Sequence, residues 1–434
     1  MSKQPDRVKV LIITYYWPPA GGPGVQRWLK FVKYLPQYNI EPVVYIPENP
    51  EYALLDKTLT SEVPKGVTIL EKAIWEPYKY ASLFSNKETK TISKGIIEKK
   101  AKQSSIQQLL LFIRGNFFIP DARKFWIKPS VKYLKQVLTD QEINTIITTG
   151  PPHSVHLIGN QLKKQLGIRW IADFRDPWTS IGYHSKLKLL PFAQKKHKRL
   201  EKEVLNSADH IITTSFTTTQ DFQELTQKPV TTITNGFDAE KVEGEVFLDK
   251  KFTISHIGSL LADRNPTNLW KVLSTLVKSH KDFASFFELK LAGAVSEEVL
   301  SSIEEAGLKE YTTNLGYVSH TKAVQLQQSS QLLLLIEIDH KDCKGIIAGK
   351  LFEYLKAKRP ILALGPVNSD VEKIIKETES GYYFTYNTTE TLQNQLLTYY
   401  KHYKNKELQS ASKNILKYHR KNLTGSLAEV IKSF

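Results

Sequence analysis

The sequence predicts an α/β protein made of two successive units, each with a parallel sheet covered by helices. In both halves of the chain, short apolar runs typical of buried strands alternate with amphipathic stretches typical of helices. The 434 residues are more than one ordinary hydrophobic core holds. A turn-rich, charged stretch at 236–250 separates the two series. We therefore expect domains over 1–238 and 239–407, followed by a helix over 408–434 that packs back on the first domain.

The first unit opens with the apolar run Val8–Thr14, which we expect to be a buried strand. A Pro/Gly-rich turn follows it, and an amphipathic stretch over 25–35 then predicts a helix. Further strand-like runs in this half are found at 42–46, 145–149, 169–172 and 210–214.

The second unit repeats the same alternation. Helix-like segments separate its apolar runs, which again favours parallel strands joined by crossover helices. The strand-like runs of this half are 252–257, 289–292, 332–336 and 360–364.

The composition is that of a globular protein, with 41% hydrophobic residues. Cys343 is the single cysteine and cannot form an internal disulfide, and no signal-like segment opens the chain, so we expect a cytoplasmic protein. The longest apolar runs fall far short of the roughly 20 residues that span a bilayer as a helix. Any membrane association is therefore expected to be peripheral.

The chain is strongly basic, with 60 Lys and Arg against 44 Asp and Glu and a formal charge of +16. Such a charge suits a nucleic acid, a phosphorylated substrate or an anionic lipid surface, or simply reflects a basic surface. No recognition helix, RNA-binding aromatic motif or zinc module is recognisable, so no nucleic-acid partner is expected.

A glycine-rich turn containing Gly21 and Gly22 follows the first strand directly. Glycines at this position allow backbone amides to approach a diphosphate at a helix N-terminus. The spacing is neither G-x-G-x-x-G nor a Walker loop. A tight turn that needs positive φ explains the same residues, and both interpretations stay open.

The second unit contains two further phosphate-binding candidates. Arg264 follows the strand that ends in His256-Ile-Gly-Ser259, and a guanidinium there could neutralise charge on a leaving phosphate. Lys350 and Glu353 are three residues apart and share a helix face, so the lysine could meet phosphate while the carboxylate accepts ribose hydroxyls. The alternatives are a solvated surface arginine and an ordinary surface ion pair.

These segments, in this order, make the sequence resemble the retaining glycosyltransferases of family 4, in particular the bacterial members that build surface polysaccharides and lipid-linked glycans. The resemblance covers nearly the whole chain. It implies the GT-B fold, in which two Rossmann-like domains face each other across a cleft and the second binds most of the nucleotide-sugar. The segments that carry the resemblance are Gly21-Gly22, Ile171-Ala-Asp-Phe-Arg-Asp-Pro-Trp178, Thr234-Asn-Gly-Phe-Asp238, Ile257-Gly-Ser259 with Arg264, and 350–355.

The resemblance implies that Gly22 donates a backbone hydrogen bond to the diphosphate, that Arg264 and Lys350 bind phosphate, and that Glu353 binds the ribose. Two departures limit the transfer. Gly345 stands where the first of the family's two glutamates, eight apart, would be, and the usual Gly-x-x-x-x-x-Lys pattern is altered. The expected donor-binding residues are Gly21, Gly22, Ser259, Arg264, Lys350 and Glu353.

The expected catalytic residues follow strands of the first unit. Asp173, Arg175 and Asp176 lie in one segment, and Arg175 stands where many relatives place a histidine. His153 follows another strand and a rigid Gly-Pro-Pro turn. A structural ion-pair corner is the alternative for the first three residues, and a structural role is the alternative for His153.

The resemblance further implies that the anomeric configuration is retained and that the departing phosphate takes the acceptor proton. No Asp-x-Asp motif or His/Cys cluster is present, so we expect neither a metal nor another cofactor. The expected partners are a nucleotide-sugar donor and a glycan or lipid-diphosphate acceptor.

Two basic, aromatic stretches at 75–126 and 186–199 suit contact with an anionic membrane surface, such as the inner face of the cell membrane, or are solvated charged faces. Three functions compete with sugar transfer: a nucleotide-sugar epimerase of the same architecture, a catalytically silent sugar-nucleotide binder, and a non-catalytic basic binding protein.

Overall fold

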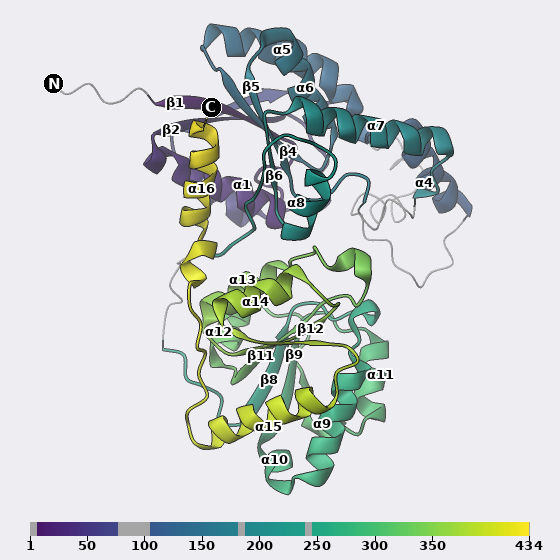
Figure 1. Cartoon of the computed structure of the whole chain (residues 1–434), viewed down its shortest axis with the longest axis vertical. Helices are drawn as coiled ribbons and strands as arrows, with labels where there is room; N and C mark the ends of the chain where they lie inside the picture. The colour runs from purple at the N-terminus through teal and green to yellow at the C-terminus, as the bar shows by residue number, and fades with distance from the viewer. Residues whose placement is uncertain (1–6, 77–104, 181–186, 239–244, 434) are drawn as a thin grey trace, which may run out of the picture. The chain divides into compact units, whose positions relative to one another are not determined.

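The computed structural model describes residues 7–76, 105–180, 187–238 and 245–433. The chain forms two compact units (Figure 1). Unit 1 comprises Met1–Asn235 and Arg420–Phe434, and unit 2 comprises Gly236–His419. The parallel α/β architecture predicted from the sequence is confirmed in both units.

Unit 1 is built on a seven-stranded parallel sheet in the order β3-β2-β1-β4-β5-β6-β7. Its strands are β1 (Val8–Thr14), β2 (Ile40–Pro47), β3 (Thr68–Lys72), β4 (Thr145–Gly150), β5 (Arg169–Phe174), β6 (His210–Thr213) and β7 (Val230–Thr232). Its α-helices are α1 (Pro23–Tyr34), α4 (Ser105–Phe117), α5 (Ile127–Asp140), α6 (Ser154–Leu166), α7 (Pro191–Ser207), α8 (Phe216–Gln223) and α16 (Arg420–Lys432).

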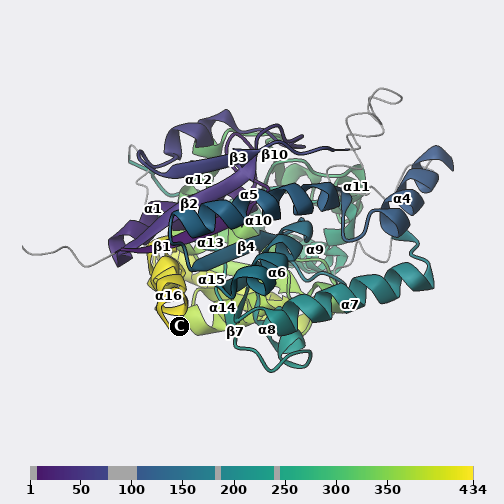
Figure 2. The same ribbon diagram turned by 90° about the horizontal axis from the view of Figure 1, so that it is seen from above.

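Strand β1 shows why helices cover both faces of this sheet. Its side chains point alternately to opposite faces, because the side-chain period of a strand is two. Leu11 and Ile13 enter the core that α5 and α6 complete, whereas Val10 and Ile12 enter the core that α1 and α16 complete. The last five residues of β1 are therefore buried between two layers of helices. Figure 2 looks onto the side of this sheet that α5 and α6 cover.

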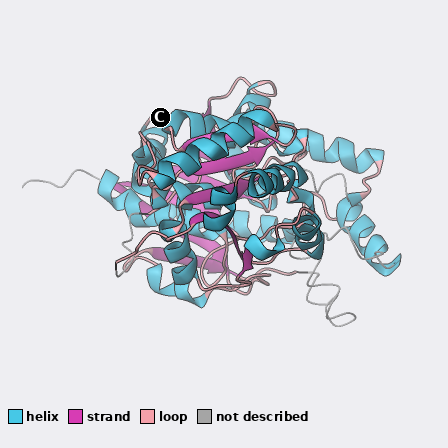
Figure 3. Ribbon diagram, turned by 90° about the horizontal axis from the view of Figure 1, so that it is seen from below, coloured by secondary structure: helices cyan, strands magenta, loops and turns pink. Residues whose placement is uncertain are grey.

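Unit 2 has a six-stranded parallel sheet in the order β10-β9-β8-β11-β12-β13, and its strands run between helices (Figure 3). Its strands are β8 (Phe252–Ile257), β9 (Phe287–Ala292), β10 (Thr312–Asn314), β11 (Leu332–Ile336), β12 (Ile361–Gly365) and β13 (Gly381–Thr385). Its α-helices are α9 (Thr267–Ser279), α10 (Lys281–Phe286), α11 (Glu297–Glu305), α12 (His320–Ser329), α13 (Gly349–Ala357), α14 (Asp370–Thr378) and α15 (Glu390–Lys404).

Four strands of the two sheets were not predicted: β3, β7, β10 and β13. Each of them is the outermost strand of its sheet. The side chains of β3 and β10 are mostly exposed, and those of β7 are half-buried. Edge strands of this kind lack the continuous apolar run that identifies the inner strands.

The final helix is shorter than the one expected over 408–434. Helix α16 begins at Arg420, and the residues before it belong to unit 2, where Leu408 is buried in the core. Helix α16 packs on α1 and contributes Leu427 and Ile431 to the core of unit 1. Burying side chains of this size contributes roughly 1.5–3 kcal/mol each.

Within the described part of the chain, no helix is long and apolar enough to cross a membrane. Much of the first basic, aromatic stretch, at 77–104, and the start of the second, at residue 186, lie outside the described residues.

Candidate functional site

Two cationic side chains lie near the carboxyl end of β8 in unit 2. Lys350 is the second residue of α13, and its Nζ lies 3.1 Å from Nε2 of His256 in β8. Arg264 ends the short 3-10 helix Ala262–Arg264 that follows β8. Neither cation forms an ion pair with a carboxylate of the described residues. Nε of Arg264 is also buried there without a hydrogen-bond partner.

This grouping affects the charge on Lys350. Burial lowers the pKa of its ammonium group to about 8, and the neighbouring Arg264 acts in the same direction, while Glu353 opposes them. A half-buried cation beside a second cation is destabilised unless an anion binds nearby. The cluster also lies at the N-terminus of α13, where backbone N–H groups and the helix dipole favour negative charge. These residues can therefore bind a phosphate group.

Gly258 makes room for this lysine. Its φ is 128°, a value that side-chain-bearing residues rarely adopt, and a Cβ at this position would lie 2.7 Å from Nζ of Lys350. The turn that contains Gly258 also carries Ser259, which is exposed. Three of the expected donor-binding residues, Ser259, Arg264 and Lys350, therefore come from elements around the end of β8.

Glu353 does not form the surface ion pair that was one explanation for its spacing from Lys350. Its Oε2 instead accepts a hydrogen bond of 2.7 Å from Nε2 of Gln327 in α12. The carboxylate is half-buried and is close enough to Lys350 to raise the pKa of the lysine. Lys350 and Glu353 therefore lie close together on α13 without forming a direct salt bridge.

The sequence analysis missed Glu337, a buried carboxyl directly after β11. Hydroxyl groups of Ser369 and Tyr383 donate hydrogen bonds of 2.9 Å and 2.7 Å to it. Burial raises its pKa to about 7, although these two hydroxyls and Arg264 favour the charged form. The signal was available, because an acidic residue at the carboxyl end of a buried parallel strand lies where open α/β sheets bind ligands.

In unit 1, Asp173 lies within a closed polar cluster. Its side chain is completely buried, and it forms an ion pair of 3.0 Å with Arg27. Nε1 of Trp28 and the hydroxyl of Thr149 donate further hydrogen bonds of 2.8 Å and 2.7 Å. This bonding favours the structural interpretation, in which Asp173 ties β4 and β5 to α1.

Arg175, just after β5, lies against the glycine-rich turn. Its guanidinium donates hydrogen bonds to the carbonyl oxygens of Gly150 and Pro151. A Cβ at Gly24 would lie 1.5 Å from Nη1 of Arg175, so the glycine opens the space that the guanidinium occupies. Burial raises the pKa of the neighbouring Asp176, and Arg175 opposes that shift. The structure thus places Arg175 against the start of α1, with Asp176 close enough to feel its charge.

Gly21 and Gly22 both have a role in the local backbone conformation. Gly22 is the N-cap of α1 and has a φ of 106°. The N–H of Gly21 donates to the carbonyl of Leu54 at 3.0 Å, and a Cβ on Gly21 would approach that leucine to 3.1 Å. The positive φ favours the tight-turn interpretation for Gly22, although the N-terminus of the helix that it caps can still face an anion. Gly21 is held by its contacts with Leu54.

A cavity of about 90 Å³ lies beside His153 in unit 1. The ring of His153 is buried and stacks on Trp178, with ring centroids 4.7 Å apart and an interplanar angle of 2°. Other lining residues include Tyr16, Arg114, Phe118, Asp121, Arg123, Pro151, Leu187 and His197. His153 is thus the predicted catalytic residue that reaches a cavity, whereas Asp173, Arg175 and Asp176 do not line it.

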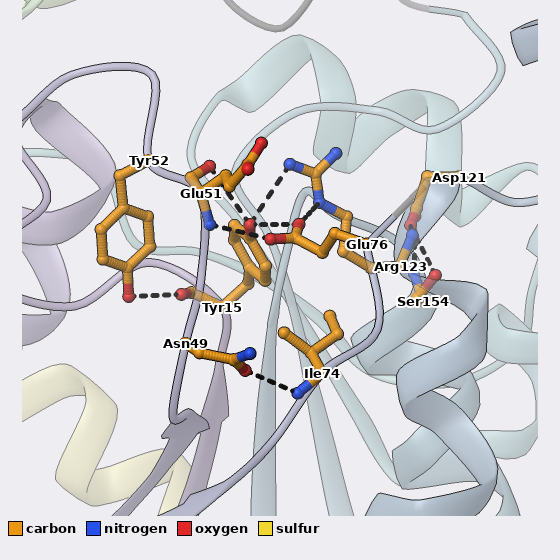
Figure 4. Close-up of polar contacts among 9 residues, drawn as sticks. All are labelled: Tyr15, Asn49, Glu51, Tyr52, Ile74, Glu76, Asp121, Arg123 and Ser154. Carbon is orange, nitrogen blue, oxygen red and sulfur yellow. Dashed lines mark hydrogen bonds and ion pairs between the residues drawn. The ribbon is translucent and has the colours of Figure 1, made fainter. Parts of the chain in front are cut away.

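A buried polar network fixes one wall of this cavity (Figure 4). Nε of Arg123 lies 3.1 Å from a carboxylate oxygen of Glu76, and the hydroxyl of Tyr15 donates to the same carboxylate at 2.6 Å. Asp121 accepts hydrogen bonds from the backbone of Arg123 and from both the amide and the hydroxyl of Ser154. These contacts join the segment after α4 to the start of α6. The segment that carries Asp121 and Arg123 is therefore fixed by hydrogen bonds to its neighbours.

Comparison with known proteins shows solved structures with a similar fold but no matching sequence family. No family model matches the chain, and no curated protein matches it. Among solved structures, Anabaena HepE in complex with UDP is similar with a TM-score of 0.61 and 13% identity, over 98% of this chain and 100% of that chain.

Two other solved structures are similar over nearly their full length. Sucrose-phosphate synthase from Thermosynechococcus elongatus has a TM-score of 0.58 and 11% identity, covering 98% of each chain. A Listeria monocytogenes protein named as a UDP-N-acetylglucosamine 2-epimerase has a TM-score of 0.54 and 12% identity, covering 98% of this chain and 96% of that one. The chain therefore has the two-domain, Rossmann-like GT-B fold that the sequence predicted.

Proposed function

We propose that this protein is a glycosyltransferase that moves a sugar from a nucleotide-sugar to a glycan or lipid-linked acceptor. The observation that carries the proposal is the pair of cations in unit 2, Lys350 and Arg264, which have no carboxylate ion-pair partner among the described residues. A diphosphate is the ligand that such a pair suits. The fold similarity to HepE, whose structure contains UDP, supports the same ligand class.

The diphosphate of the donor binds to the cations and to the N-terminus of α13. Lys350 and Arg264 neutralise the charge that develops on the leaving phosphate as the bond to the sugar C1 breaks, which makes the transfer independent of a metal ion. The carboxylate of Glu353, already oriented by Gln327, accepts hydrogen bonds from the ribose. The new bond forms on the same face of the sugar, so the configuration is retained, and the departing phosphate takes the acceptor proton.

The acceptor binds to unit 1, beside the cavity that His153 and Trp178 line. Aromatic and proline walls suit the apolar faces of a sugar ring. His153 contacts the acceptor in this proposal, while Arg175 and Asp176 shape the backbone around it.

We further propose that unit 1 contacts an anionic membrane at the inner face of the cell membrane. An aromatic–lysine patch, formed by Trp75, Phe117, Phe125 and Lys124, exposes its three aromatic rings. The rings of Trp75 and Phe125 have centroids 4.6 Å apart, and Nζ of Lys124 donates a hydrogen bond of 2.7 Å to the carbonyl oxygen of Phe117. Nζ of Lys124 lies 5.2 Å from the centroid of the Phe125 ring. Such a patch can place rings in the lipid interface and ammonium groups against lipid phosphates.

Vesicle co-sedimentation tests the membrane contact. Wild type should sediment with phosphatidylglycerol vesicles and remain in solution with phosphatidylcholine vesicles. The variant Trp75→Ser/Phe125→Ser should lose most of the binding. Equal binding by both proteins would remove the patch from the proposal.

The first experiment on the donor site is a thermal-shift panel with UDP, GDP, ADP and CMP, with and without magnesium. We expect one nucleotide to stabilise the wild type, with no effect of a chelator. The shift should be lost in Lys350→Ala and reduced in Glu353→Ala. Lys278→Ala, which removes an exposed lysine in the last turn of α9, is the matched control and should keep the full shift.

A nucleotide-sugar epimerase is the second candidate, because the Listeria protein has a similar fold. Incubation of the stabilising nucleotide's sugar conjugates without an acceptor separates the two functions. An epimerase converts the donor sugar under these conditions, whereas a transferase requires an acceptor. The absence of a shift with any nucleotide, together with tight nucleic-acid binding, would instead favour a basic binding protein.

A further inference from the structure

We propose that His256 is a positioning residue for the donor site: its neutral ring accepts a hydrogen bond from Lys350 and orients the ammonium group without neutralising it. The proposal rests on the proposed function for its role in phosphate binding, but the hydrogen bond itself can be tested without a nucleotide. His256 is absent from the sequence-based set of site residues.

The contacts of the ring determine which nitrogen carries the proton. Nδ1 of His256 lies 3.0 Å from the carbonyl oxygen of Leu334, which can only accept, so Nδ1 must donate. In a neutral ring Nε2 then has a free lone pair, and Nζ of Lys350 lies 3.1 Å from it. The second carbonyl near Nε2, that of Ser259, is more distant at 3.4 Å. The ring is therefore a donor to β11 and an acceptor from α13.

The surroundings keep the ring neutral. His256 is completely buried in β8, and burial lowers its pKa well below the usual value, with Lys350 and Arg264 adding to the effect. The charged groups that act on Lys350 are Arg264 from the 3-10 helix after β8 and Glu353 from α13 itself. A protonated ring between two cations would be unfavourable, so the proton stays on Nδ1 alone.

A neutral acceptor differs in kind from the usual partner of a buried lysine. A carboxylate would orient the ammonium group but would also cancel its charge and compete with the phosphate. An imidazole lone pair fixes one of the three N–H bonds and leaves the whole positive charge available. Gly258 completes the arrangement, because a side chain there would occupy the position of Nζ. His256 and Gly258 together thus hold Lys350 in place while the lysine stays charged.

Competitive acetylation of Lys350 over a range of pH, read by mass spectrometry, tests the hydrogen bond directly on the full chain. Wild type should show a midpoint near the value of about 8 expected for this lysine. His256→Phe removes the acceptor, so the midpoint should fall by about one unit, since a hydrogen bond to the charged form raises a pKa. His256→Gln retains an acceptor oxygen and should restore most of the wild-type value.

Binding of inorganic pyrophosphate at pH 7, measured by calorimetry, tests the consequence. Affinity at pH 7 should fall about twofold in His256→Phe and less in His256→Gln, since a pKa one unit below about 8 lowers the charged fraction of Lys350 from about nine-tenths to about one half. An unchanged midpoint and unchanged affinity in a folded His256→Phe variant would overturn the proposal. If pyrophosphate binds no variant but the midpoint still moves, the positioning role stands and the proposed function fails.

Nitrogen NMR of the wild type, with labelled histidine, gives a test that does not depend on a variant that folds. A ring with the proton on Nδ1 and a bare Nε2 is expected. A ring protonated on Nε2, or on both nitrogens at neutral pH, would contradict the proposal.

Discussion

The two units treat buried charge in opposite ways. In unit 1, Asp173 and Arg27 neutralise each other, and the donors around them complete the hydrogen bonds of the carboxylate. In unit 2, Lys350 and Arg264 lie together without an ion-pair carboxylate from the described residues, and Glu337 is held by hydroxyl groups. The Asp173 cluster is closed, because its charges neutralise each other, and it stabilises the fold. The Lys350–Arg264 cluster is open, because its charge is available to a ligand. Removing a residue of the closed cluster should therefore lower stability, whereas removing a residue of the open cluster should lower ligand affinity.

The largest expected effect comes from opening the closed cluster. Asp173→Ala leaves Arg27 buried without its carboxylate, and we expect the free energy of unfolding to fall by about 3–5 kcal/mol. Urea unfolding of the purified protein measures this loss. Asp173→Asn keeps the shape and should cost less. A stable Asp173→Ala variant that has lost transfer activity would instead assign Asp173 to catalysis.

The next effect concerns the pH dependence of unit 2. The pKa of Glu337 is raised from 4.5 to about 7, so the folded state holds a proton that the unfolded state has released over this range. Stability should therefore decrease as pH rises from about 4.5 to 7, by roughly 2–3 kcal/mol. Glu337→Gln cannot titrate, and its unfolding free energy should lack this decrease. Parallel slopes for both proteins would show that Glu337 does not titrate in this way.

Removal of an open-cluster cation should weaken binding but leave the fold intact. Arg264→Met deletes a guanidinium whose Nε has no hydrogen-bond partner among the described residues. We expect unfolding stability to be unchanged or slightly higher. The affinity for the stabilising nucleotide should fall by about 1.5–3 kcal/mol, as for a hydrogen bond to a charged group. A clear loss of stability would place Arg264 in a structural network and remove the contrast between the units.

The smallest change in free energy among these variants is expected from Gly24→Ala, and it is a loss of stability. Its new Cβ would overlap Nη1 of Arg175, and a displaced flexible side chain costs about 1 kcal/mol. Transfer activity reports whether the arginine matters beyond packing. If it does, activity should fall in Gly24→Ala and in Arg175→Ala, and the double variant should be no worse than Arg175→Ala. Additive losses would indicate that Gly24 acts independently.

The inner part of each sheet could be predicted from the sequence because burial on both faces leaves a continuous apolar run, as in Leu332–Ile336. The outermost strands could not, since their side chains are exposed or half-buried and form no such run. The start of α16 was misplaced because 408–419 forms no α-helix, only the short 3-10 helix Ile415–Tyr418, and contributes Leu408 to the core of unit 2.

The candidate site was predictable only as far as residue type and position after a strand allow. That rule predicts Arg264 and Lys350 as phosphate-binding residues, and in the structure both lie around the end of β8. It cannot separate Asp173, which has three partners, from a carboxylate that faces a ligand, because those partners come from α1 and β4. His256 was missed for a related reason: a histidine within an apolar strand shows its function only through its two distant partners.

The path of the chain has a consequence for its synthesis. Unit 2 is a single continuous segment, and its two ends are already joined, because the N–H of Phe237 donates to the carbonyl of Tyr418 at 3.1 Å. Unit 1 is interrupted, and its core includes Leu427 and Ile431 from α16. On the ribosome, unit 2 can therefore complete its core first, whereas unit 1 must wait with one apolar surface of α1 uncovered until α16 emerges.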